Sequence, residues 1–312
     1  MKVNYKLPFT LVSFICITLL IKFSLPDYKN YKQQKKEFWI KKTHDGTRKN
    51  IIVAGDSRTY RGVSTAKILA ELGEKGKELS AANLGYSSAG FGDNYLDYID
   101  QRIQKNTAEK RLIILGLTPW SLTAKACINE QYEQYKAATY IEQFKAFYLN
   151  NYINFEPYKP TEFWEISQHP STSDFYNNQE YYEQFHTDGW IASYRLPLDS
   201  MRAVGDYTKV FTESKIDPAR LEAVFQKVET WIGQGIKVIA FRPPTTYAME
   251  NLEDSLSGYD EQTTIRKLRK LGVDYLETNN EDFLSYDGSH LHYESAESLS
   301  KQLGILSKKT LN

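Results

Sequence analysis

The run Ile51-Ile52-Val53-Ala54-Gly55-Asp56-Ser57-Arg58 is the feature that most constrains how this chain folds. Four apolar residues, three of them β-branched, predict a short buried strand, and Gly-Asp-Ser ends that strand abruptly. Open α/β sheets carry their ligand sites at the carboxyl ends of the strands. Ser57 therefore stands where a parallel sheet would present a reactive side chain.

Apolar segments of the same kind recur along the chain and alternate with helical patterns. The further predicted strands are Ala82–Leu84, Leu112–Leu115, Lys237–Phe241 and Val273–Leu276. The predicted helices are Ser64–Leu72, Asn94–Gln104, Pro218–Gly233, Glu261–Leu271 and Ser295–Leu306. Strands separated by helices indicate βαβ units with right-handed crossovers. The expected fold class is therefore α/β, built on a doubly wound parallel sheet.

The composition excludes some classes of partner. The chain has 312 residues, 41% of them apolar, which is ample for a globular core. Lysine plus arginine equals aspartate plus glutamate at 39 each. Because a nucleic-acid site needs a strongly basic face, no nucleic-acid partner is expected. Cys16 and Cys127 are the two cysteines, and with Cys16 in an apolar N-terminal segment no disulfide is expected in the main domain.

That apolar segment, residues 7–25, predicts a transmembrane signal anchor after a short tail of residues 1–6. A spanning helix needs about 20 apolar residues, and Lys22 could snorkel to the interface. A cleaved signal peptide would need a small-x-small cleavage site, and a lipoprotein signal at Cys16 would need a small residue in place of Ile15. A buried soluble helix fits poorly with the basic flank and with Pro26 immediately after. Lysines on both flanks leave the orientation open under the positive-inside rule.

The segment 26–49 is polar and lysine-rich, and it is expected to form a stalk or a membrane-proximal helix. The main domain is then 50–312, with an insertion at about 120–200 that is rich in tyrosine and includes a helical stretch at Asn129–Leu149. Two interpretations of the insertion stay open. Its aromatic residues could form a small core of their own, or they could provide a stacking platform for sugar rings.

Asp287 and His290 stand on one short loop before the last predicted helix. A serine hydroxyl becomes nucleophilic when a histidine takes its proton, and a carboxylate on the other ring nitrogen fixes the tautomer. His292 is a rival base. The histidines at 44, 169 and 186 are scattered, so neither a metal nor another cofactor is expected.

In these blocks the chain resembles the SGNH (GDSL-like) hydrolase and acyltransferase superfamily. The resemblance covers residues 50–310, in short blocks, and implies a flavodoxin-like doubly wound sheet. It implies that Ser57 is the nucleophile, His290 the general base and Asp287 its partner. It also implies an oxyanion hole formed by the Ser57 N–H and by a backbone N–H of the loop after the second strand, for which Ser88 and Gly90 are candidates.

The third block departs from the family pattern. Gly116-Leu117-Thr118-Pro119 places Thr118 where the family has an asparagine that donates to the oxyanion. A threonine hydroxyl could donate in its place, with shorter reach. The alternative is that these residues form only the turn that ends a strand.

The surroundings of the serine, the turn Thr118-Pro119-Trp120 and the strand end Phe241-Arg242-Pro243-Pro244 resemble membrane-anchored envelope members of this superfamily. That resemblance implies a domain outside the cytoplasmic membrane, on the periplasmic or extracellular side, that works with a membrane-bound O-acyltransferase. Arg58 and Arg242 are candidate substrate-binding residues for an acyl carboxylate, a phosphate or a uronate, with a surface salt bridge as the alternative for each.

The sequence therefore predicts a serine esterase or O-acyltransferase acting on acyl, most simply acetyl, esters of an envelope glycan. A general carboxylesterase or lipase acting on a small ester is one alternative. A non-catalytic scaffold that binds a glycan or a partner is the other, because Thr118 replaces the expected asparagine.

Overall fold

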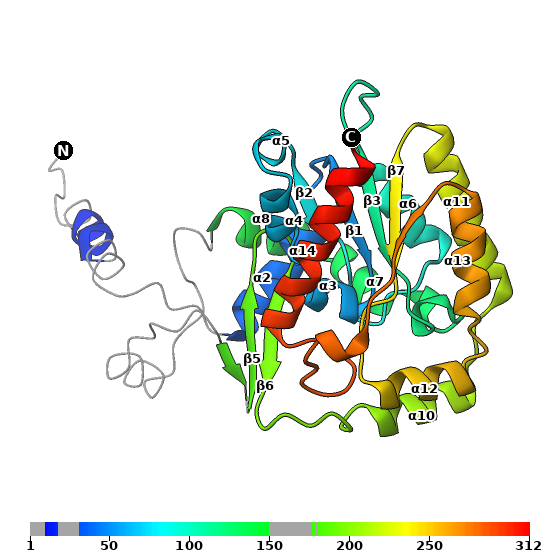
Figure 1. Ribbon diagram of the computed structural model, residues 1–312. Coiled ribbons are helices and arrows are strands. Elements are labelled where there is room, and N and C mark those ends of the chain that lie inside the picture. Colours follow the sequence, from blue (N-terminus) through cyan, green and yellow to red (C-terminus); the bar gives the residue numbers. More distant parts are fainter. Residues whose placement is uncertain (1–9, 18–30, 150–175, 179) are drawn as a thin grey trace, which may run out of the picture.

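The computed structural model describes residues 10–17, 31–149, 176–178 and 180–312 (Figure 1). Its central sheet has five parallel strands in the order β2-β1-β3-β7-β8. The strands are β1 (Ile51–Gly55), β2 (Ala81–Asn83), β3 (Leu112–Gly116), β7 (Lys237–Phe241) and β8 (Asp274–Leu276). This is the flavodoxin-type order of a doubly wound sheet. The prediction of an α/β fold with a parallel sheet is thus confirmed, and each predicted strand lies within a residue of its observed position.

Helices surround this sheet, with short 3₁₀ turns between some of them. The α-helices are α2 (Tyr31–His44), α3 (Ser57–Gly62), α4 (Thr65–Glu71), α5 (Glu74–Lys77), α6 (Asp93–Arg102), α7 (Glu130–Lys136), α8 (Tyr140–Phe147), α10 (Val204–Glu213), α11 (Pro218–Gly233), α12 (Tyr247–Leu256), α13 (Glu261–Lys270) and α14 (Tyr293–Thr310). The 3₁₀ turns are η1 (Trp120–Leu122), η2 (Ala126–Ile128) and η4 (Asn280–Asp282).

The two faces of the sheet bury different residues of each strand. In β1, Ile52 and Ala54 join one apolar cluster, with residues of α6 and α11, whereas Ile51 and Val53 join the other, with residues of α4 and α14. Side chains alternate between the faces of a strand, so a strand that is covered on both sides is apolar throughout. Figure 1 shows α14 running along the face opposite α6 and α11. Because helices cover both faces of the sheet, the central strands β1 and β3 are uninterrupted runs of buried residues.

Helix α2 corrects the predicted stalk. Trp39 and Ile40 of this helix are buried, and the Trp39 ring, 1% exposed, belongs to the same cluster as Ile52. Lysine stems lie along apolar surface while their charges reach polar partners, so a lysine-rich helix can still pack against a domain. The folded domain therefore includes residues 31–44 and does not begin at residue 50.

The insertion forms a second, antiparallel sheet of β4 (Tyr176–Asn178), β5 (Tyr181–Phe185) and β6 (Ile191–Arg195). This sheet is not predicted from the sequence. Tyr132 of α7 packs on Tyr86 and Tyr98 in the main core, with ring centroids 5.4 Å and 4.9 Å apart. The described part of the insertion thus extends the main core instead of forming a separate one, whereas a role in stacking sugars stays a prediction.

The predicted anchor, residues 7–25, falls mostly outside the described residues. Residues 10–17 within it are helical. In the part of the chain that the structure describes, no helix is both long and apolar enough to cross a bilayer. The anchor therefore stays a prediction.

Candidate active site

Ser57 is the first residue of α3, directly after β1 and its Gly55-Asp56 turn. The Asp56 side chain caps the helix by accepting a hydrogen bond from the Arg58 N–H at 3.0 Å. A Cβ on Gly55 or on Gly116 of the neighbouring β3 would approach the Thr59 hydroxyl to 2.2 Å. Glycine at both strand ends therefore allows α3 to lie close to the sheet, and Ser57 is held at the strand edge.

The acid and the base come from a tight loop just before α14. The Ser285 hydroxyl donates to the carbonyl of His290 at 2.8 Å and accepts from the N–H of Gly288 at 2.9 Å. Gly288 has a φ of 90°, and a Cβ there would meet the carbonyl oxygen of Ser200 at 2.2 Å. The loop can close only with glycine at this position, and its closure turns Asp287 and His290 toward α3.

The three predicted residues come together in a single line of hydrogen bonds. The Nε2 atom of His290 lies 2.9 Å from Oγ of Ser57, and its Nδ1 atom lies 2.8 Å from Oδ2 of Asp287. All three residues are partly exposed, so the serine hydroxyl is neither sealed in the core nor free in solvent. This is the geometry of a nucleophile, a base and a carboxylate that orients the base.

The Asp287 carboxylate is bound more firmly than its contact with His290 alone would provide. Its Oδ1 atom accepts from the backbone N–H groups of Ser289 at 2.9 Å and of His290 at 2.7 Å. Burial alone would raise the pKa of this carboxyl, but the imidazole and these N–H donors together hold it well below its ordinary value. Asp287 is therefore ionised at neutral pH and can stabilise a protonated His290.

His292, the rival base, has a different role. Its Nδ1 atom accepts from the N–H of Glu294 and so caps α14, and its ring lies against Tyr293 with centroids 4.7 Å apart. Burial lowers the pKa of this imidazole. The structure thus directs His292 toward the start of α14 and His290 toward Ser57.

The oxyanion candidates divide into two groups. The single hydroxyl hydrogen of Thr118 goes to Oδ2 of Asp56 at 2.5 Å, and the Gly90 N–H donates to Oδ1 of Asn129 at 2.9 Å. Both donors are buried and already have acceptors inside the protein, so this arrangement does not offer either hydrogen to an oxyanion, and the roles of Thr118 and Gly90 stay predictions. Ser57, whose N–H opens a helix and has no intrahelical acceptor, and the exposed Ser88, with a φ of 54°, stay candidates.

The two predicted substrate-binding arginines lie in the interior. Arg58 is 2% exposed, and its guanidinium donates to Oε1 of Glu253 at 2.7 Å and to the Ser289 hydroxyl at 3.0 Å. Arg242 donates to the other oxygen of Glu253 at 3.1 Å and to Glu261 at 2.8 Å. Both arginines form ion pairs, as the alternative interpretation predicts, but these pairs are buried and do not lie on the surface. This arrangement does not support a substrate-binding role for either arginine.

Sequence reasoning missed several residues that support the site. Glu253 of α12 joins the two arginines, and the Tyr207 ring of α10 lies 4.9 Å from the Arg58 guanidinium. The Tyr286 ring stacks on His290 with centroids 5.9 Å apart, and its hydroxyl accepts from Arg61 at 2.7 Å. Tyr286 could have been suspected because it directly precedes Asp287, whereas Glu253 carries no local signal.

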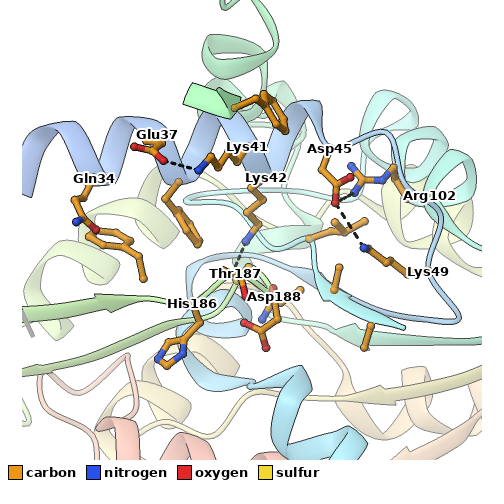
Figure 2. Close-up of a pocket in the computed structure, with 18 residues that line it drawn as sticks. Gln34, Glu37, Lys41, Lys42, Asp45, Lys49, Arg102, His186, Thr187 and Asp188 are labelled. Atoms are coloured by element: carbon orange, nitrogen blue, oxygen red, sulfur yellow. Dashed lines mark hydrogen bonds and ion pairs between the residues drawn. The ribbon is translucent and has the colours of Figure 1, made fainter. Parts of the chain in front are cut away.

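A cavity of about 380 Å³ lies apart from the triad, between α2, the β2 strand and the turn between β5 and β6 (Figure 2). Figure 2 shows its charged groups already paired, Lys41 with Glu37 and Arg102 with Asp45. The Lys42 ammonium donates to the Gly189 carbonyl at 2.9 Å and lies 5.0 Å from the Trp39 ring. The charged groups that line the cavity thus have partners within the protein, and none of the triad residues lines it.

Comparison with known proteins adds little to this site. No family model matches the chain, and no curated protein matches it. A solved structure described as "a putative platelet activating factor from Streptococcus pneumonia" is similar at 12% identity and a TM-score of 0.34, over 94% of this chain and 96% of that chain. At that TM-score the similarity supports no conclusion about fold or activity.

Proposed function

We propose that this chain is a serine esterase or O-acyltransferase of SGNH type. The observation that carries the proposal is the unbroken contact from Asp287 through His290 to Ser57, with distances of 2.8 Å and 2.9 Å. The resemblance in the sequence blocks agrees with it, because the serine follows the first strand of a parallel sheet and the Asp-His loop precedes the last helix.

In the proposed reaction, Nε2 of His290 takes the hydroxyl proton of Ser57 while Oγ attacks the carbonyl carbon of an ester. The Asp287 carboxylate stabilises the imidazolium that forms. His290 then passes the proton to the leaving oxygen, and an acyl-Ser57 intermediate remains. Water or a sugar hydroxyl, deprotonated by the same imidazole, attacks this acyl group and frees Ser57.

The oxyanion of each tetrahedral intermediate would form beside the first turn of α3. The Ser57 N–H is the first donor, and Ser88 of the loop after β2 is the candidate for the second. Loss of one such donor typically costs about 2.7–4 kcal/mol of barrier stabilisation.

We infer a membrane-anchored enzyme that acts outside the cytoplasmic membrane on acetyl esters of an envelope glycan, alongside a membrane-bound O-acyltransferase. The apolar segment 7–25 and the tyrosine-rich insertion support this form of the proposal. A general carboxylesterase and a non-catalytic scaffold are the competing functions.

A fluorophosphonate probe tests whether Ser57 is reactive. The purified protein should be labelled at Ser57, labelling should vanish in Ser57→Ala, and it should fall at least a hundredfold in His290→Ala. His292→Ala is the matched control, because it removes a neighbouring histidine that caps α14, and it should keep most of the labelling. Absence of labelling in well-folded protein would leave the scaffold as the better function.

The two catalytic outcomes are separated by the fate of the acyl group. Acetyl release from an aryl acetate is compared with and without an added oligosaccharide, and mass spectrometry detects acetylated sugar. Acetylated sugar that depends on Ser57 supports a transferase, and release to water alone supports an esterase.

A further inference from the structure

Helix α8 presents a continuous apolar face to the outside of the protein. Tyr140, Ile141, Phe144 and Tyr148, which directly follows the helix, are 89%, 69%, 52% and 62% exposed. Residues spaced by three or four positions lie on the same side of a helix, so these four side chains form one patch. Ala146, on the opposite side, is buried. Patches of this kind on soluble surfaces mark sites that bind a partner or a membrane.

The patch is held in a fixed relation to α2. Helix α8 packs against α2, and Lys36 of α2 pairs with Glu142 of α8 at 2.8 Å. A capping box between Thr139 and the same Glu142 fixes the start of α8. The apolar face therefore cannot turn inward without breaking both the cap and the ion pair.

The distance along the chain brings this patch close to the predicted anchor. The anchor ends at residue 25 and α2 begins at Tyr31, so six peptide links join them. Six links reach at most about 22 Å when fully extended. The first turn of α2 must then lie within about that distance of the bilayer, and α8 lies against α2.

We propose that the exposed face of α8 rests in the headgroup region of the membrane that holds the anchor; this inference rests on the membrane anchoring proposed above. Tyrosine is enriched at this depth because its ring is apolar and its hydroxyl polar, and Ile141 and Phe144 supply apolar area. Lys145, exposed on the same helix, can meet anionic headgroups. The exposed face of α8 thus holds the domain against the bilayer. It also limits rotation of the domain about the short segment that joins α2 to the anchor.

A fluorescent reporter on the full chain tests this contact. The native cysteines are replaced, Cys16→Ser and Cys127→Ser, and the dye NBD is attached at Ile141→Cys. The matched control is Ile305→Cys on α14, whose native side chain is 62% exposed. Both proteins are reconstituted at low protein-to-lipid ratio into vesicles of phosphatidylcholine and phosphatidylglycerol, with and without lipids that carry a doxyl quencher near the headgroup.

The expected result is a blue-shifted emission at position 141 that the lipid quencher reduces at least twofold, with neither effect at position 305. Equal, unquenched emission at both positions overturns the proposal. A blue shift at 141 that the lipid does not quench also overturns it, because protein would then cover the face, either a second copy or another part of this chain.

Vesicle flotation and fluorophosphonate labelling distinguish failure of the docking proposal from failure of the proposed membrane anchoring and of the proposed reactivity of Ser57. If the full chain does not float with the vesicles after a carbonate wash, membrane anchoring fails and the docking proposal fails with it. If it floats but position 141 is not quenched, the docking proposal alone fails. With the dye kept at Ile141→Cys, the double variant Phe144→Asp, Tyr148→Asp should lose the lipid quenching, while fluorophosphonate labelling of Ser57 in detergent stays within about twofold of the parent.

Discussion

The hydroxyl of Thr118 donates a 2.5 Å hydrogen bond to the buried carboxylate of Asp56. Asp56 caps the helix that begins with Ser57, so this contact connects the end of β3 to the turn that presents the serine. Burial raises the pKa of the Asp56 carboxyl, and the Thr118 hydroxyl and the Arg58 N–H oppose that rise. Thr118 thus helps to hold the Gly55-Asp56-Ser57 turn in place.

Thr118→Val tests this support. The substitution keeps the shape of the side chain but leaves a carboxylate oxygen buried without its donor, and we expect a loss of about 1–3 kcal/mol in the free energy of unfolding. Thr118→Ser keeps the hydroxyl and should cost less. Denaturant unfolding of the three proteins measures the difference. Unchanged stability in the valine variant would show that the hydroxyl does not hold Asp56.

Glu253→Gln should be strongly destabilising. The change leaves Arg58 and Arg242 without the carboxylate they share, and loss of one partner of a buried ion pair typically costs about 3–5 kcal/mol. Glu250→Gln is the control, because this partly exposed carboxylate lies 4.0 Å from Arg242 and should contribute less than about 1 kcal/mol. Similar unfolding midpoints for the two variants would contradict the importance of the shared carboxylate.

Asp287→Asn should change how stability depends on pH. The pKa of Asp287 lies below its unfolded value of about 3.9, so its ionisation stabilises the fold above that pH, and the contribution is lost as pH falls toward the folded pKa. The difference in melting temperature between the parent and Asp287→Asn should therefore be constant above about pH 5 and should shrink progressively as the pH falls below about 4. Asp206→Asn, at an exposed position on α10, should show no such convergence.

Trp39→Ala tests whether α2 belongs to the folded domain. Removal of a fully buried tryptophan should cost about 3–5 kcal/mol, since it leaves a cavity beside Tyr60 and Tyr86. Ile305→Ala, at an exposed site, should stay within about 0.5 kcal/mol. A Trp39 variant as stable as the Ile305 variant would restore the stalk interpretation.

The centre of the sheet was predictable because β1 and β3 are short, apolar and buried at every position. The run Leu112–Gly116 is buried at every position, so burial alone determines its composition. The grouping of Ser57, Asp287 and His290 was predictable because one chemical mechanism uses those three residue types together, and because the resemblance to the SGNH superfamily places them in blocks of this order. The apolar strand runs are local patterns, whereas the triad links blocks 233 positions apart and depends on recognising the chemistry that they share.

Other features depend on partners that lie far along the chain. From the sequence alone, Lys42 is expected to be a solvated charge. In the structure its ammonium contacts the Gly189 carbonyl and several aromatic rings, because the helix that carries it packs against the domain. Glu253 pairs with Arg58, which lies 195 positions earlier in the chain, and with Arg242, which lies 11 positions earlier. The strands β5 and β6 are mixed in polarity, because they contact the domain through only part of their surface. No local pattern reports such contacts.

Ser57 and His290 are 233 positions apart, and only α14 and the chain end follow the loop that carries the imidazole. A polypeptide still emerging from the ribosome can form β1 and expose its serine long before the histidine has been made. In the proposed reaction the hydroxyl therefore has no proton acceptor until the loop that carries His290 has been made. A chain cut short before this loop would lack the imidazole that the proposed reaction uses, so reactivity at Ser57 would also report that this loop has been made and folded against α3.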